Sequence, residues 1–131
     1  MTFKPHRWAW KRARCHQITS QRDALGRITA KHEERPSGIT TFEYAYDPAG
    51  RLVSEQKILP DGSSLLTQWS YDGNGNRVME VKPDGTVLTA TYDDQDRLLQ
   101  YGDWSFTYTH NGELLSQCQG SACQHFAYDV F

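Results

Sequence analysis

The segment WSYDGNGNRV, residues 69–78, has the composition of a ligand-binding loop, with two glycines and two asparagines directly after an aspartate. A phosphate loop at Gly73-Asn74-Gly75 needs a third glycine and a following helix, but the flanking residues are typical of strands. A calcium loop that starts at Asp72 needs Gly at its sixth position and Glu at its twelfth, where the sequence has Arg77 and Pro83. We therefore interpret this segment as a turn.

A cluster of carboxylates, Asp93, Asp94 and Asp96, has the spacing of a general acid and base pair. Its counterparts elsewhere in the chain are turn residues, and carboxylates in turns are usually solvated. The serines lack the strand-to-helix elbow that exposes a catalytic nucleophile. We expect no enzymatic activity and no cofactor.

Two cysteines, Cys118 and Cys123, flank the sequence QGSA, which has the composition of a hairpin tip. A third cysteine, Cys15, makes the count odd, and this fits a reducing compartment in which buried thiols behave as small hydrophobic groups. We expect free thiols. A Cys118–Cys123 disulfide and a zinc set completed by His110 and His125 are the alternatives.

Charge and length limit the class of protein. The chain has 131 residues, the length of one domain or of a piece of a larger one, and its net charge is -2. The first fourteen residues hold five basic residues, two tryptophans and no acid, which is one composition of a single-strand nucleic-acid binder. We prefer a terminal strand and no nucleic-acid partner, because the remainder is acidic. The start has no long apolar run, so we expect neither a signal peptide nor a membrane span.

One short unit recurs along the chain at intervals of about twenty residues. Its copies read YAYDPAGRLV, WSYDGNGNRV, ATYDDQDRLL and FTYTHNGELL. An earlier copy, SQRDALGRIT, lacks the aromatic residue, and a later copy, FAYDVF, is shortened. The pair Tyr-Asp occurs four times, so the segment that looked like a binding loop is one copy of a repeat.

Each unit has the pattern of a β-hairpin. Aromatic residues alternate along a first strand, and the aspartate then accepts backbone N–H groups at the turn. The glycine four residues after the tyrosine supplies a positive φ, at Gly50, Gly75 and Gly112, and Asp96 takes this place in one copy. We expect valine to be tolerated less well at Gly50 or Gly75 than at Gly120, whose turn lies outside the motif. Pro60-Asp61-Gly62 and Pro83-Asp84-Gly85 are predicted as turns that lead to the next unit.

The fold class predicted from this pattern is all-β, built from tandem antiparallel hairpins. We expect each tyrosine ring to pack against a neighbouring repeat. The motif assigns structural roles to Tyr46, Asp47, Gly50, Arg51, Tyr71, Asp72, Gly75, Arg77, Tyr92, Asp93, Arg97, Tyr108, Gly112, Tyr128 and Asp129. We expect no catalytic, cofactor-binding or metal-binding residues.

The units YDPAGRLV and YDGNGNRV resemble the YD repeat of the Rhs/YD-repeat family, and the likeness covers roughly residues 16 to 131. The resemblance implies hairpins that spiral into a hollow β-shell, as in bacterial Rhs toxins, the C-component of insecticidal toxin complexes, wall-associated proteins and teneurins. In the bacterial members the shell contains a toxin domain used against other bacteria or delivered to a host. The alternative is a surface module that binds carbohydrate or a receptor. The sequence lacks the Pro-x-x-x-x-Asp-Pro-x-Gly-Leu stretch that ends the shell in the family.

The expected organisation is a basic aromatic segment, 1–15, followed by about five repeats in 16–131, the last one truncated. About ten strands spaced by about 4.8 Å would close into a barrel only about 15 to 20 Å across, too narrow for another domain. We therefore expect a fragment of a shell, whose partners are the remainder of its parent protein or the toxin domain. Open sheet edges predict self-association. The resemblance implies a bacterial cytoplasmic protein before export, or one secreted by a dedicated system such as type VI secretion.

Overall fold

The computed structural model describes residues 16–128, and in this range it consists of strands and the turns that join them. The all-β prediction is confirmed, since each strand is antiparallel to the strands with which it pairs. The basic segment 1–15, which we predicted as a terminal strand, and Asp129 lie outside the described residues.

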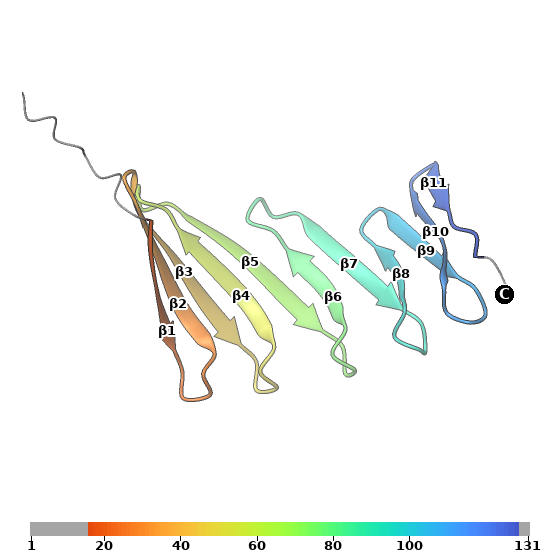
Figure 1. The fold of residues 1–131 in the computed structure, drawn as a ribbon, viewed down its shortest axis with the longest axis horizontal. Coiled ribbons are helices and arrows are strands. Elements are labelled where there is room, and N and C mark those ends of the chain that lie inside the picture. The colour runs from red at the N-terminus through yellow and green to blue at the C-terminus, as the bar shows by residue number, and fades with distance from the viewer. Residues whose placement is uncertain (1–15, 129–131) are drawn as a thin grey trace, which may run out of the picture. The chain divides into compact units, whose positions relative to one another are not determined.

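The described residues form eleven strands, which neighbour each other in the sheet in the order of the sequence (Figure 1). The strands alternate between the first and second arms of the predicted hairpins. Their bounds are β1 Gln17–Arg22, β2 Ile28–Arg35, β3 Gly38–Tyr46, β4 Leu52–Ile58, β5 Ser64–Tyr71, β6 Arg77–Val81, β7 Val87–Tyr92, β8 Leu98–Tyr101, β9 Trp104–Tyr108, β10 Leu114–Gln119 and β11 Ala122–His125.

Backbone contacts divide the chain into two units. The first comprises Met1–Tyr44 and Gln56–Leu65, and the second comprises Ala45–Glu55 and Leu66–Phe131. In the first unit β2 pairs with β1 on one side and with β3 on the other. In the second unit the strands from β5 to β11 pair in series.

The turns at the Tyr-Asp position of each repeat, which we call the YD turns, share one backbone geometry, including the copies that start with Arg22-Asp23 and Tyr108-Thr109. In the turn at 47–51 the N–H of Asp47 donates to the Arg51 carbonyl at 2.9 Å, and the N–H of Gly50 donates to the Asp47 carbonyl at 2.9 Å. The turns that begin at residues 23, 72, 93 and 109 repeat both bonds. Register shifts in the ladder lie beside several of these turns, as in a three-residue hairpin loop closed by a bulge.

The last position of each loop has a positive φ, as the sequence predicts. Gly50 has a φ of 83° and Gly75 one of 91°, and Asp96, the exception in sequence, has a φ of 59°. Gly120 also has a positive φ, of 57°. A β-branched residue is strained at any of these positions, so lying outside the motif is not a reason for Gly120 to tolerate valine, and the expected order of tolerance stays a prediction.

Few side chains are buried, because the strands of each unit form a single layer. Among the described residues only Ala90 and Ser116 are buried, with 7% and 6% of their surface exposed. Large apolar side chains lie exposed on several strands, among them Ile18, Leu65 and Val87. A two-layer core therefore does not hold the described repeats together, and their stability depends more on the contacts between neighbouring turns.

Candidate functional site

The aspartate of each YD turn organises the turn with its carboxylate. Asp47 Oδ1 accepts the backbone N–H of Arg51 at 2.9 Å, and Asp47 Oδ2 accepts Arg51 Nε at 2.7 Å. Asp93 and Arg97 make the same two contacts, at 2.9 and 2.6 Å. The carboxylate thus fixes the turn and holds the arginine side chain in one orientation, as expected for a charge-assisted pair.

These contacts lower the pKa of the turn aspartates. The pKa values of Asp47 and Asp93 lie below the usual value mainly because the backbone N–H of the arginine four residues later donates to the carboxylate. For Asp23 the largest cause of the lowered pKa is the hydrogen bond from the Arg27 side chain. Burial acts to raise the pKa of Asp72, but hydrogen bonds from residues 74, 75 and 76 together outweigh it and the pKa is lowered. The charged form is favoured in every case.

Four of the motif tyrosines reach back to the preceding repeat. Tyr71 Oη donates to the carbonyl of Leu52 at 2.7 Å, and Tyr108 Oη donates to the carbonyl of Leu98 at 2.8 Å. Tyr92 and Tyr128 make the equivalent bond to the carbonyls of residues 77 and 114, at 3.0 and 2.8 Å. Each acceptor lies two residues after the glycine position of the earlier turn, so the contact repeats in register.

The arginine of a YD turn reaches forward to the next repeat. The Arg51 guanidinium lies 4.8 Å from the centre of the Tyr71 ring, and Arg51 Nη1 donates to the Asp72 carbonyl at 3.2 Å. Arg97 lies over the Tyr108 ring at 5.2 Å. Successive turns are therefore joined in both directions, by a phenol bond backward and a guanidinium contact forward. We call this set of contacts the YD ladder.

One step of the YD ladder is built from different residues. Asn76 takes the place of Arg51 and Arg97, and its amide donates to Asp96 Oδ1 at 2.7 Å as well as to Asp72 Oδ2 at 3.1 Å. Asn74 donates to the same oxygen of Asp96 at 2.9 Å. Two departures from the motif, an asparagine for arginine and an aspartate for glycine, thus form a replacement link. The sequence analysis missed Asn74, Asn76 and Asp96 as contact residues.

The other copies of the motif keep the backbone geometry of the YD turn but differ in their side-chain contacts. In the first copy Arg22 stands in the tyrosine position and donates to the Gly26 carbonyl at 2.6 Å. In the copy before Gly112 a threonine replaces the aspartate, and its hydroxyl accepts the N–H of Glu113 at 3.1 Å. Arg77 comes one residue after the arginine position of the motif, and its guanidinium lies 5.0 Å from the centre of the Trp69 ring. Tyr46 ends β3, in the place that Tyr71 has at the end of β5.

The two C-terminal cysteines form a disulfide, Cys118–Cys123, so the expectation of free thiols is wrong. The residues are directly opposed on β10 and β11, which brings their side chains to the same face at the end of the predicted hairpin. The odd number of cysteines suggested free thiols, but two cysteines that lie next to each other can form a disulfide whatever the total number of cysteines in the chain. The same bond uses both sulfurs that the zinc alternative needs.

The other candidates for chemistry are engaged in the turns. The Asp93 carboxylate binds the arginine of its own loop, and the Asp96 carboxylate accepts the two asparagine amides. The Asp72 carboxylate accepts the N–H groups of Asn74 and Asn76 at 2.9 Å each, as the turn interpretation predicts. Within residues 16–128 no group of three or more histidine, cysteine or acidic residues is placed to hold a metal. The same residues contain no helix suited to crossing a membrane.

An antiparallel sheet of short hairpins, joined turn to turn by tyrosines, defines a YD-repeat protein. Residues 4–131 match the family described as Teneurin YD-shell, and the chain belongs to this family. This confirms the Rhs/YD-repeat resemblance.

Relatives with known names include a bacterial toxin and two solved complexes. The chain is 32% identical over 93 residues, 70% of its length, to Double-stranded DNA deaminase toxin A of Burkholderia cenocepacia (strain H111). It is similar to crystal structures of TcdB2-TccC3 without the hypervariable C-terminal region, with a TM-score of 0.66, 19% identity and 79% of this chain covered, and of TcdB2-TccC3-Cdc42, with values of 0.61, 18% and 76%.

The chain spans only 5% to 6% of the length of these proteins. The two structures share its fold, and together with the family match they favour a segment of a YD shell over the alternative of a separate surface-binding module.

Proposed function

We propose that these residues form one segment of the wall of a YD shell that encloses or presents a toxin domain, in competition between bacteria or in toxin delivery. Residues 16–131 are the repeat region in this proposal, and 1–15 are a separate basic segment. The partners are the remainder of the parent protein and the toxin domain that it carries. The segment itself is structural and not catalytic.

The YD ladder is the observation that carries the proposal. Four tyrosine bonds of 2.7 to 3.0 Å, from Tyr71, Tyr92, Tyr108 and Tyr128, reach back to the preceding repeat, and the acceptor has the same place each time. A contact that repeats in register can be continued by any number of further repeats, which is what the wall of a large shell requires. The match to a named toxin supports the enclosed cargo.

The apolar side chains that the single layer leaves exposed support a larger assembly. Leu65, Leu66 and Val87 have between 42% and 53% of their surface exposed, more than a stable isolated layer would be expected to leave in water. We therefore propose that the isolated chain associates with itself or needs its parent protein to stay soluble. Light scattering tests this, and a stable monomer at micromolar concentration with cooperative unfolding would argue for a self-sufficient domain.

The decisive experiment identifies the polypeptide that carries these residues in cells. Antibodies against 16–128 capture it, mass spectrometry reads its full length, and limited proteolysis follows the fate of its C-terminal part. The proposal predicts further YD repeats and a C-terminal domain that resists protease until the shell is denatured. A signal peptide or a wall anchor next to these repeats, with no protected domain, would contradict it.

Export follows from the same proposal. We propose that the parent protein is made in the bacterial cytoplasm and leaves through a dedicated secretion system, of which type VI secretion is one candidate. Fractionation of producing cells, with and without that system, tests the route independently of the shell.

A further inference from the structure

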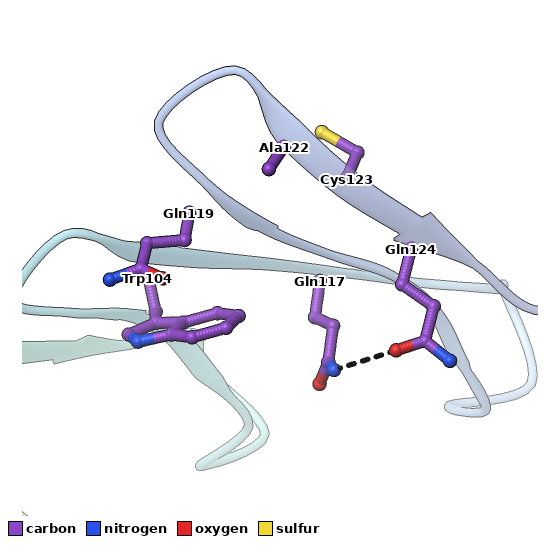
Figure 2. A pocket seen from close by; sticks show the side chains of 6 residues that line it. All are labelled: Trp104, Gln117, Gln119, Ala122, Cys123 and Gln124. Carbon is purple, nitrogen blue, oxygen red and sulfur yellow. Dashed lines mark hydrogen bonds between the residues drawn. The ribbon is translucent and has the colours of Figure 1, made fainter.

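The Cys118–Cys123 disulfide joins β10 and β11 of the last described hairpin, and the YD ladder uses neither sulfur. Cys118 is half-buried and Cys123 is exposed. Cys123 and its neighbour Gln124 point to opposite sides of β11 (Figure 2). Access to a sulfur atom is one of the factors that set the rate of thiol–disulfide exchange, so a thiolate in solution can attack this bond while the chain is folded.

The disulfide accounts for a large part of the attachment of β11. This strand has four residues, Ala122–His125, which are all exposed, and within residues 16–128 it pairs with β10 alone. Gln117 Nε2 on β10 donates to Gln124 Oε1 on β11 at 3.1 Å (Figure 2). A short, exposed strand buries little apolar surface, so the covalent bond contributes more here than it would in a packed core.

The same hairpin carries a step of the YD ladder. Directly after β11 the N–H of Phe126 donates to the Leu115 carbonyl at 2.9 Å. Two residues later Tyr128 Oη donates at 2.8 Å to the carbonyl of Leu114, the first residue of β10. The disulfide and the tyrosine bond therefore join the same two segments of chain, and loosening one should loosen the other.

We propose that the Cys118–Cys123 bond is a redox switch that sets how firmly β11 and the ladder step at Tyr128 are held. The closed bond restricts residues 118–123 when the hairpin opens, and this favours the paired strands. Reduction leaves two thiols at the same positions, so the hairpin still forms, but its strands separate more often. The switch thus changes the stability of one repeat and leaves the distant repeats as they are.

The reductant is a small thiol of the glutathione class. Its thiolate attacks the sulfur of Cys123, the S–S bond breaks, and the sulfur of Cys118 leaves as a thiolate that takes up a proton. A second glutathione thiolate attacks the glutathione sulfur of this mixed disulfide and releases Cys123, which is protonated in turn. The protein gains two electrons and two protons, and two glutathione molecules become one glutathione disulfide. Oxidised glutathione reverses both steps.

The two states of the switch belong to different compartments, and this part of the inference rests on the proposed function. The cytoplasm keeps thiols reduced, whereas disulfides persist outside it. A chain made in the cytoplasm would carry the open switch and a loosened ladder step, and it would close the switch after export. The chemistry itself depends only on the hairpin, so the isolated chain tests it whether or not the parent protein encloses a toxin.

Hydrogen exchange measured by mass spectrometry tests the switch in the 131-residue chain with Cys15→Ser, which leaves the hairpin cysteines as the only two. Exchange is compared in the oxidised chain, after reduced glutathione, and after reoxidation with oxidised glutathione. Reduction should speed exchange in 122–126 by about tenfold or more, and in the turn 109–113 by a smaller factor. Both should return on reoxidation, and exchange in 17–46 should not change.

Two variants separate the switch from a general loss of stability. The double variant Cys118→Ala, Cys123→Ala should exchange like the reduced chain with or without glutathione. Tyr128→Phe removes the ladder bond, so reduction should still loosen 122–126 but should no longer alter 109–113. The proposal is overturned if glutathione opens the bond only in unfolded chain, if reduction leaves 122–126 unchanged or loosens 17–46 equally, or if the response at 109–113 persists in Tyr128→Phe.

Discussion

The turns at the two ends of the hairpins have the same backbone but different side-chain chemistry. In the turn at 82–86 the N–H of Lys82 donates to the Thr86 carbonyl at 2.8 Å and the N–H of Gly85 to the Lys82 carbonyl at 2.9 Å, the bonds that the YD turns also make. The aspartate stands first in a YD turn, and in the Pro-Asp-Gly turns it stands third, at Asp61 and Asp84.

This shift in position changes what the aspartate can do. Asp84 Oδ1 accepts the N–H of Thr86 at 2.9 Å, two residues away, so its contact stays inside the turn. Asp47 in a YD turn holds an arginine that contacts the next repeat. Neighbouring turns at the Pro-Asp-Gly end meet by packing, as where Pro60 lies against Gly38. A polar link between repeats at this end is made by strand residues, where Tyr101 Oη donates to Glu80 Oε2 at 2.8 Å. At the YD end the residues of the turns themselves make the links.

Loss of a ladder tyrosine should have the largest effect. Tyr71→Ala removes a half-buried ring and its bond to Leu52, and we expect it to lower the free energy of unfolding by about 2 to 3 kcal/mol. Tyr71→Phe keeps the ring and should cost about 1 kcal/mol. Urea denaturation measures both. A cost below about 0.5 kcal/mol for the alanine variant would mean that the ring contributes nothing to the coupling of repeats.

The shared backbone predicts that glycine substitutions cost the same in both kinds of turn. Gly75 and Gly85 have φ values of 91° and 83°, so alanine at either should destabilise the chain by about 1 to 2 kcal/mol. Gly73 lies in the same loop as Gly75, and an added Cβ there would have no neighbour within 4 Å. Gly73→Ala is thus the matched control and should be neutral or slightly stabilising in thermal melts. Equal shifts at positions 73 and 75 would contradict the turn geometry.

Asn76 and Asp96, which replace the arginine and the glycine of the motif, contact each other, so mutations at these two positions should be energetically coupled. Asn76→Ala and Asp96→Gly each break the amide link, and the second also relieves the positive φ of a non-glycine residue. A double-mutant cycle should give an interaction energy of about 0.5 to 1 kcal/mol between these positions. Asn76→Ala combined with Asp84→Gly should be additive, because Asp84 bonds within its own turn.

Acid should weaken both kinds of turn. The pKa values of Asp93 and Asp84 are lowered chiefly by backbone N–H donors, so the folded state holds their protons less tightly than the unfolded chain does. Stability is therefore full above the unfolded pKa of about 3.9 and is lost as the pH falls through the lower folded values. Urea melts from neutral pH down to about pH 2 should show this decline, with a shallower slope in Asp93→Asn. A stability that rises on acidification would contradict the assignment.

The hairpins were predictable because each one is encoded locally. Alternating aromatics, an aspartate and a glycine three residues later are enough to specify two strands and a turn. The links between repeats were only partly predictable. Tyr71 was expected to pack on a neighbouring repeat, but its carbonyl acceptor lies 19 residues earlier, and no local pattern gives that register.

The substituted step and the disulfide were missed for a related reason. Asn76 and Asp96 each look like a weakened copy of the motif, and their contact is visible only when two turns are placed side by side. Cys118 and Cys123 are directly opposed because of the register of one short hairpin, which the odd cysteine count does not encode. Contacts between elements depend on register, and the sequence specifies register only within each hairpin.

We expect the YD turns, and not the Pro-Asp-Gly turns, to transmit stability from one repeat to the next. Hydrogen exchange measured by mass spectrometry on Tyr71→Phe and on Asp84→Ala tests it most directly. The Tyr71→Phe variant should exchange faster at its own turn and also at the turn 47–51 of the preceding repeat, whereas Asp84→Ala should exchange faster only at 82–86. Faster exchange confined to the mutated turn in both variants would contradict the claim.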